Sequence, residues 1–221
     1  MSREKEKGKG MAQRKDGIEK RRRILTAACR IFAEKGYHAA SVADICRWAG
    51  ANVAAVNYYF GDKATLYAEA WQTAYEKRLS PEFTEADNVA PEEQLRLFIH
   101  SLIQHFTEHG SQGEFTRLYL KELANPTGLI SNLWHKLIEP RRQVLLNIIR
   151  NIMGATANND EAVLFCEVSI VNQCRTLSTL RRSDLEYLLD QPLSSDLITR
   201  LGDHIADFSL AGIKAVAENK P

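Results

Sequence analysis

Apolar residues recur along the first part of the chain with the three-to-four-residue spacing of amphipathic helices. One such stripe covers residues 17–35 and ends at Gly36, a residue type that commonly terminates helices. Three N-cap residues each precede a further apolar pattern: Ser41, Asn52 and Asp62. These signals predict short helices within 41–49 and 53–59, and a fourth helix that ends before Pro81. The apolar face of the helix within 41–49 is expected to comprise Val42, Ile45, Cys46 and Trp48.

The rest of the chain continues the helical theme. Helical patterns cover residues 91–109, 114–124, 127–153, 159–182 and 195–218, and they are separated by the stretches HGSQG, NPT, GATANND and DQPLSS. The sequence contains no run of alternating apolar and polar residues rich in β-branched side chains. The predicted fold class is therefore all-α, with about nine helices.

The composition is that of a globular protein that buries a core, with 44% apolar and 26% charged residues in 221. The sequence contains neither the apolar segment of a signal peptide nor eighteen consecutive apolar residues, so we expect a cytoplasmic protein without a membrane span. The four cysteines are widely spaced and form no CxxC motif, which favours buried thiols of a reducing compartment. Cys166 and Cys174 are eight residues apart, a spacing that leaves a redox or metal role open.

Positive charge is concentrated at the N-terminal end. Residues 1–63 carry a net charge of +7 and residues 64–221 a net charge of −6. A basic head on an acidic body indicates that the head binds a polyanion, because phosphate neutralisation supplies most of the non-specific affinity for DNA. Residues 1–16 are expected to form a basic flexible tail, and this tail is equally compatible with a merely solvated, lysine-rich segment.

Residues 41–60 have the pattern of a helix-turn-helix, in which two short helices flank a turn that contains Gly50. In such motifs the second helix enters the major groove and the first crosses the DNA backbone. A recognition helix has to present small or polar side chains at its N-terminal end, and the sequence Asn-Val-Ala-Ala at 52–55 does so.

The stretch IFAEKGYHAASVADICRWAGANVAAVNYYFGDKATLY resembles the TetR-family DNA-binding domain over about sixty residues. The resemblance rests on the ILTAACRIFAEKGY pattern, the Ala-Gly turn, the Tyr-Tyr-Phe end of the recognition helix and the lysine after the next cap. ANVAAVNYYFGDK and the stretch from Arg117 to Pro140 are similar to the CecR-type branch of this family, although Lys121 stands where that branch has arginine. The resemblance implies a DNA-binding domain at 17–63 and an effector-binding and dimerisation domain at 64–221.

The resemblance and the chemistry of the side chains together suggest DNA contacts. Ser41 and Asn52 are each compatible with helix capping and with a hydrogen bond to DNA. We expect groove contacts from Val53, Ala54, Ala55 and Asn57, with Asn57 as the polar base reader, and phosphate contacts from Tyr58 and Lys63. Arg47 can reach the backbone or remain a solvated surface side chain.

By resemblance, the later helices enclose a ligand chamber, and the last two pack against their copies in a homodimer. Candidate chamber residues are Trp71, Tyr75, Phe98, His105, Phe106, Phe115, Tyr119, Trp134, Asn172 and Arg175, although an ordinary core or surface position is the commoner role for each. Apolar residues on more than one face of the last two helices suggest an interface containing Val163, Ile170, Leu197, Leu201, Ile205 and Phe208.

Catalytic motifs are absent from the sequence: it has no GxSxG, P-loop or GxGxxG, and the pair His105-x3-His109 lacks a nearby third metal ligand. We therefore expect neither enzymatic activity nor a cofactor or metal. The leading hypothesis is a ligand-responsive repressor that binds a pseudo-palindromic double-stranded operator as a homodimer and responds to an unknown small-molecule effector. Two alternatives are a regulator controlled by a protein partner and an architectural DNA-binding protein.

Overall fold

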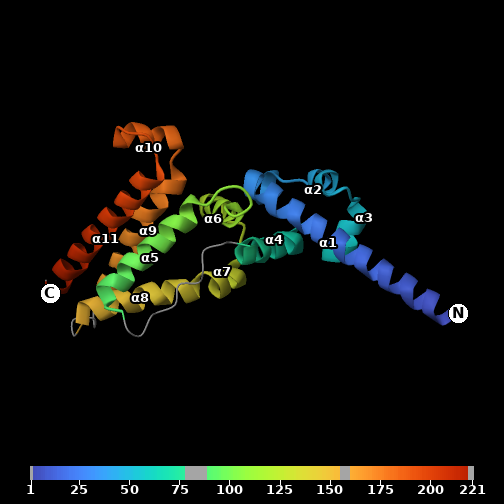
Figure 1. Cartoon of the computed structure of the whole chain (residues 1–221), viewed down its shortest axis with the longest axis horizontal. Helices are drawn as coiled ribbons and strands as arrows, with labels where there is room; N and C mark the ends of the chain where they lie inside the picture. The colour runs from blue at the N-terminus through green and yellow to red at the C-terminus, as the bar shows by residue number, and fades with distance from the viewer. Residues whose placement is uncertain (1, 78–88, 155–159, 219–221) are drawn as a thin grey trace. The chain divides into compact units, whose positions relative to one another are not determined.

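The computed structural model describes residues 2–77, 89–154 and 160–218, with side chains from residue 15 onward (Figure 1). These residues form eleven α-helices and no strand, which confirms the predicted all-α class with two helices more than expected. The helices are α1 (Ser2–Ala39), α2 (Val42–Ala49), α3 (Val53–Phe60), α4 (Lys63–Lys77), α5 (Pro91–Thr107), α6 (Glu114–Ala124), α7 (Ser131–Leu137), α8 (Glu139–Met153), α9 (Asp160–Thr179), α10 (Arg182–Leu189) and α11 (Ser195–Glu218).

The two additional helices arise at places where the apolar periodicity is uninformative. The predicted helix 127–153 is divided into α7 and α8 next to Pro140, which occupies the first turn of α8, where its missing N–H costs no hydrogen bond. Helix α10 was not predicted: Leu185, Leu188 and Leu189 have helical spacing, but the pattern covers only eight residues, too few for the periodicity to be distinguished from a loop. At the other end of the chain, α1 begins at Ser2, so residues expected to form a flexible tail are helical.

Packing divides the chain into two units that interleave along the sequence. Unit 1 comprises the described residues of Met1–Lys77 and Gly110–Leu133, and unit 2 those of Arg78–His109 and Trp134–Pro221. Helix α6 therefore belongs to the same unit as α1–α4, and the boundary predicted after residue 63 lies inside unit 1.

The core of unit 1 is formed where α1 packs against α2, α4 and α6. Its largest fully buried side chains include Ile24, Phe32, Leu66, Tyr67, Trp71 and Phe115. The chain leaves helical geometry at Gly36, where φ is 75°, close to the predicted end of the first helix. This positive φ favours glycine and turns the chain toward α2.

In unit 2, α5 lies beside α8, α9 and α11 in a helical bundle (Figure 1). Buried aliphatic side chains from all four helices fill the centre of this bundle, among them Leu95, Ile99, Leu145, Ile149, Ile170 and Ile205. The bundle therefore has a continuous apolar core of its own.

All four cysteines are buried free thiols, as predicted. Burial raises the pKa of Cys29 and of Cys174 to about 12, so neither is a thiolate near neutral pH. Within residues 2–77, 89–154 and 160–218, no group of three His, Cys, Asp or Glu side chains could hold a metal ion. Over the same residues, no helix has the length and apolar character needed to cross a membrane.

Candidate nucleic-acid interface

The turn between α2 and α3 is fixed by local capping. Helix α2 begins at Ser41, whose Oγ accepts a hydrogen bond from the backbone N–H of Asp44 at 3.0 Å. It ends at Gly50, which adopts the left-handed conformation (φ 60°, ψ 42°) and turns its N–H back toward the last carbonyls of the helix. A side chain at this position would be strained, so the glycine sets the angle at which α3 leaves the turn.

Helix α3 exposes one face to solvent and packs its other face against the rest of unit 1. Its N-cap is Asn52, whose Oδ1 accepts from the N–H of Ala55 at 2.9 Å, so the capping role considered for Asn52 is realised. Val56 and Phe60 are buried, whereas the exposed residues are Val53, Ala54, Asn57 and Tyr58. Tyr58 is 82% exposed, which leaves its hydroxyl accessible to a ligand of unit 1.

Two predicted orientations require correction. Ala55 was expected to face the groove, but it is buried beside Val56, because the helical period places both on the packing side of α3. Trp48 was expected on the apolar face of α2, but it is 48% exposed, and the Arg30 guanidinium lies 5.3 Å from the centre of its ring. Trp48 lies at the edge of the buried stripe, where a small difference in helix rotation decides exposure.

The start of α4 carries the cation expected to bind phosphate. Asp62 caps this helix by accepting from the N–H of Thr65 at 2.7 Å. The next residue is Lys63, whose Nζ lies 4.4 Å from the centre of the Tyr37 ring, within the range of a cation–π interaction. Partial burial lowers the pKa of Lys63.

Neighbouring charges around α2 are already paired within unit 1. Arg47 donates to Asp44 at 2.9 Å, and Lys35 donates to the other oxygen of the same carboxylate at 2.8 Å. The hydrogen bonds from Lys35 and Ser41 lower the pKa of Asp44. Arg47 is exposed, so its ion pair is readily exchanged for a phosphate.

The candidate chamber residues are distributed over both units. In unit 1 the Phe115 ring contacts Trp71 and Tyr75, with centroid distances of 5.3 and 5.1 Å, and Tyr119 is half-buried. In unit 2 the candidates Phe98, His105 and Phe106 are buried, and Trp134 is half-buried.

Asn172 and Arg175, two further candidate chamber residues, lie on the outer side of α9. Asn172 is exposed, and its Nδ2 donates to the carbonyl of Val168 at 2.7 Å. Arg175 is half-buried and donates to Asn172 Oδ1. The expectation that Asn172 lines an internal chamber is corrected, because its position on the helix turns it away from the bundle core.

The predicted interface residues also divide into two groups. Val163, Ile170, Leu197 and Ile205 are buried in unit 2 itself and Leu201 is half-buried, whereas Phe208 is 62% exposed. Three exposed apolar residues of α9 were not singled out from the sequence: Leu164, Phe165 and Val168. The sequence did indicate exposed apolar residues here, because apolar residues occupy more than one face of this helix.

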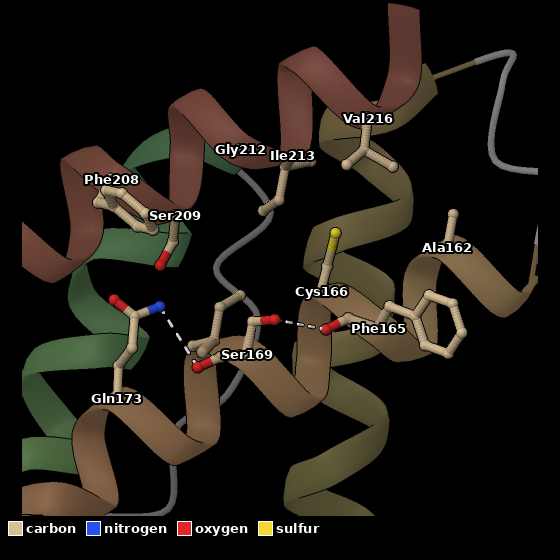
Figure 2. A pocket seen from close by; sticks show the side chains of 11 residues that line it. Ala162, Phe165, Cys166, Ser169, Gln173, Phe208, Ser209, Gly212, Ile213 and Val216 are labelled. Carbon is tan, nitrogen blue, oxygen red and sulfur yellow. Dashed lines mark hydrogen bonds between the residues drawn. The ribbon is translucent and has the colours of Figure 1, made fainter. Parts of the chain in front are cut away.

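A pocket of about 240 Å³ lies between α9 and α11 of unit 2, where Phe165 and Phe208 are exposed (Figure 2). Its lining is mainly apolar and includes Phe165, Cys166, Phe208, Ile213 and Val216. Ser169 and Gln173 lie along α9 at its edge, where each donates to a backbone carbonyl one turn earlier, at 2.9 and 3.3 Å. These two side chains are thus hydrogen-bonded within α9, whereas the Oγ of Ser209, also in the lining, is buried without a hydrogen-bond partner among the described residues.

Comparison with known proteins matches both parts of the chain to transcriptional regulators. Residues 24–70 match the family described as bacterial regulatory proteins, tetR family, and residues 91–213 match the C-terminal domain of the HTH-type transcriptional dual regulator CecR. The chain is 25% identical to CecR of Shigella flexneri over 160 residues, which cover 67% of this chain and 71% of that protein. It is 32% identical to AcrR of the same organism over 59 residues, 27% of each chain.

Solved structures show the same fold. The structure of the transcriptional regulator FadR from Bacillus subtilis, in complex with stearoyl-CoA, superposes with a TM-score of 0.61. The match has 18% identity and covers 86% of this chain and 97% of that chain. The chain thus shares its helical fold with that protein.

Proposed function

This chain belongs to the TetR family of bacterial transcriptional regulators and has a CecR-type C-terminal domain, and we propose that it acts as a homodimeric, ligand-responsive repressor of a pseudo-palindromic operator. The observation that carries the proposal is the exposed face of α3. This face joins a small apolar N-terminal end, Val53 and Ala54, to the polar Asn57 and the exposed Tyr58 hydroxyl.

The chemistry of this face suits a division between base and backbone contacts. Small side chains allow close approach of α3 to the base edges, and the Asn57 amide can pair with an adenine. Tyr58, Lys63 and the N-terminus of α2 at Ser41 flank this face with groups that bind phosphate oxygens. Ser41 and Asn52 already accept capping bonds, and the second lone pair of each oxygen, or the Asn52 amide, remains for DNA.

Dimerisation is supported by the exposed apolar surface of α9 and α11. Phe165, Val168 and Phe208 are exposed beside the apolar pocket, an arrangement that favours association. In a symmetric pair the same patch meets itself, so an exposed phenyl ring of one copy would face the recess of the other. The buried residues of the predicted interface, such as Ile170, would then support this surface from within.

Ligand sensing is supported by the family and by the large aromatic side chains within each unit. The related FadR was solved with stearoyl-CoA bound, and we propose that an amphipathic effector acts on this chain. The candidate lining residues are the buried aromatic side chains, with Phe106 of unit 2 as the residue to test. An effector releases DNA to the extent that it binds the DNA-incompetent state more tightly.

The test begins with DNA sites selected from a random library by the purified protein. We expect a palindromic consensus bound at least a thousandfold more tightly than random DNA at the same salt concentration, by fluorescence anisotropy. Equal affinity for both would instead indicate an architectural protein.

Thermal unfolding with a panel of amphipathic compounds tests ligand sensing, and a compound that stabilises the protein should also release the selected DNA site. In Phe106→Trp the same compound should release less of the bound DNA, because the larger side chain occupies part of the proposed effector site.

A further inference from the structure

A buried carboxylate joins α4 to α6 within unit 1. Tyr67 on α4 donates from its hydroxyl to Glu122 Oε2 at 2.9 Å. The backbone N–H and hydroxyl of Thr127, just after α6, donate to Glu122 Oε1 at 2.8 and 2.9 Å. Tyr67 is 1% exposed and Glu122 is 6% exposed. We call these three residues the Glu122 network.

The Glu122 network is costly to build, which suggests that it does more than fill space. Removing a carboxylate from water is unfavourable unless hydrogen bonds replace the lost hydration, and here three donors do so. Apolar side chains of similar volume would give comparable or greater stability at such a place. A directional hydrogen bond instead fixes the position of the Tyr67 hydroxyl, and with it the direction in which the ring lies between α4 and α6.

The Tyr67 ring leads directly toward the candidate DNA surface. Its centroid lies 5.1 Å from that of Tyr37, and the Tyr37 ring holds the Lys63 ammonium at 4.4 Å. The Phe32 ring also contacts Tyr67, edge to face, with the two centroids 4.9 Å apart. Glu122, Tyr67, Tyr37 and Lys63 thus form one continuous series of contacts within a single packed unit.

Helix α6 is part of the stretch that matches the CecR-type C-terminal domain, yet it packs with the helices that match the TetR DNA-binding domain. The Glu122 network therefore lies where the two sequence families meet inside one unit. A residue at this position can influence DNA binding without touching DNA.

We infer that Tyr67 and Glu122 are positioning residues for DNA binding, which orient Tyr37 and through it hold the Lys63 ammonium against a phosphate. This inference rests on the proposed function. A lysine that contacts one phosphate contributes about 0.9 to the slope of log affinity against log salt concentration. Its contact therefore changes the affinity about eightfold for each tenfold change in salt concentration. Loss of the network should therefore reduce the salt dependence, which a general loss of stability would not do.

The experiment measures the binding of a labelled duplex of random sequence over a range of salt concentrations. Lys63→Ala should make the slope shallower by about one, and Tyr67→Phe and Glu122→Gln should shift it in the same direction. Adding Tyr67→Phe to Lys63→Ala should change the slope no further, because both act on the same contact.

The matched control is Cys29→Ala, which lies in the same core but outside the network. Its thiol is fully buried and donates to the Ala70 carbonyl at 3.4 Å, so the variant should lower the unfolding temperature and leave the salt slope unchanged. An equal change of slope in Cys29→Ala would overturn the inference. If Glu122→Gln fails to fold, Tyr67→Phe, which keeps the ring, decides the question together with Thr127→Val.

The remaining outcomes separate the two proposals. If wild-type protein binds no DNA, the proposed function fails. If wild type binds and Lys63→Ala alters the slope, but Tyr67→Phe and Glu122→Gln behave as wild type, the inference alone fails. It fails equally if Lys63→Ala leaves the slope unchanged, since there would then be no phosphate contact for the network to position.

Discussion

Gly202 on α11 lies against the imidazole ring of His100 on α5, so that a Cβ atom at position 202 would come 2.9 Å from His100 Cε1. The ring is held in place because His100 Nε2 is 2.9 Å from Asp203 Oδ1. This is a point of close approach between two helices of unit 2, and only a residue without a side chain fits there.

We predict that Gly202→Ala destabilises unit 2 by about 1–3 kcal/mol, because the added methyl group displaces His100 and strains its contact with Asp203. Gly212 is the matched control on the same helix, since nothing lies within 4 Å of a Cβ atom there. Gly212→Ala should instead gain about 0.5–1 kcal/mol from helix propensity. Urea unfolding measures both, and a stabilised Gly202→Ala would contradict the packing argument.

For DNA recognition, we predict different effects at adjacent positions of α3. Asn57→Ala should relax discrimination at one base pair of the selected site, at a cost of about 1–3 kcal/mol there. Tyr58→Phe should weaken selected and random DNA alike, because its hydroxyl is expected on a phosphate. Anisotropy titrations of both duplexes distinguish these results. Equal losses on both duplexes for Asn57→Ala would reassign that residue to the backbone.

The purified chain is predicted to be a dimer, with a mass near twice 25.0 kDa in sedimentation equilibrium. Phe208→Glu should dissociate it, because a carboxylate in an apolar interface costs several kcal/mol. Ile18→Glu is the control, since Ile18 is similarly exposed but belongs to α1 of unit 1. A dimer that persists in Phe208→Glu would move the interface elsewhere, and a monomeric wild type would exclude the homodimer.

Glu114 at the start of α6 should make stability depend on pH. It is buried, and among the described residues its Oε2 has no hydrogen-bond partner. Burial raises the pKa of Glu114, against the charges of Lys77 and Arg117, which lower it. The folded state thus favours the protonated form, and its contribution to stability is lost as pH rises through the folded-state pKa.

Glu114→Gln is therefore predicted to be more stable than wild type at about pH 7, by about 1 kcal/mol, because an amide avoids the buried charge. The advantage should shrink as pH falls toward the unfolded-state pKa of about 4.3. Glu19→Gln is a surface control that should change stability little, since the Glu19 carboxylate is exposed and paired with Arg22. Urea unfolding at several pH values checks the trend, and an advantage that does not vary with pH would contradict it.

Local chemistry explains which parts of the fold were predictable. Capping by Ser41, Asn52 and Asp62 and the turn at Gly50 depend on residues within one turn of each other, and all are found as predicted. The expected bounds 114–124 and 195–218 also coincide with α6 and α11. Side-chain orientation near the edge of a stripe, as for Trp48 and Ala55, depends on tertiary packing and was predicted wrongly.

Long-range relationships could not be derived from periodicity. Tyr67 and Glu122 are 55 residues apart, and nothing in either helix alone indicates that they meet. A glutamate within the pattern of α6 was a signal for an unusual environment, but its partner was not identifiable. Likewise, the apolar residues of α9 show two faces without indicating that Ile170 turns inward and Phe165 outward.

The interleaving of the two units has a consequence for how the protein is made. Residues 1–77 lack α6, so Tyr67 and Trp71 stay uncovered until the chain beyond Ala124 has emerged from the ribosome. The core of unit 1 is therefore completed only by a segment that is synthesised after α5, the first helix of unit 2. A gene fragment that ends with α4 would encode an incomplete unit 1 with an exposed aromatic surface. A chimaera that exchanges the DNA-binding domains of two related regulators should therefore also exchange residues 110–133.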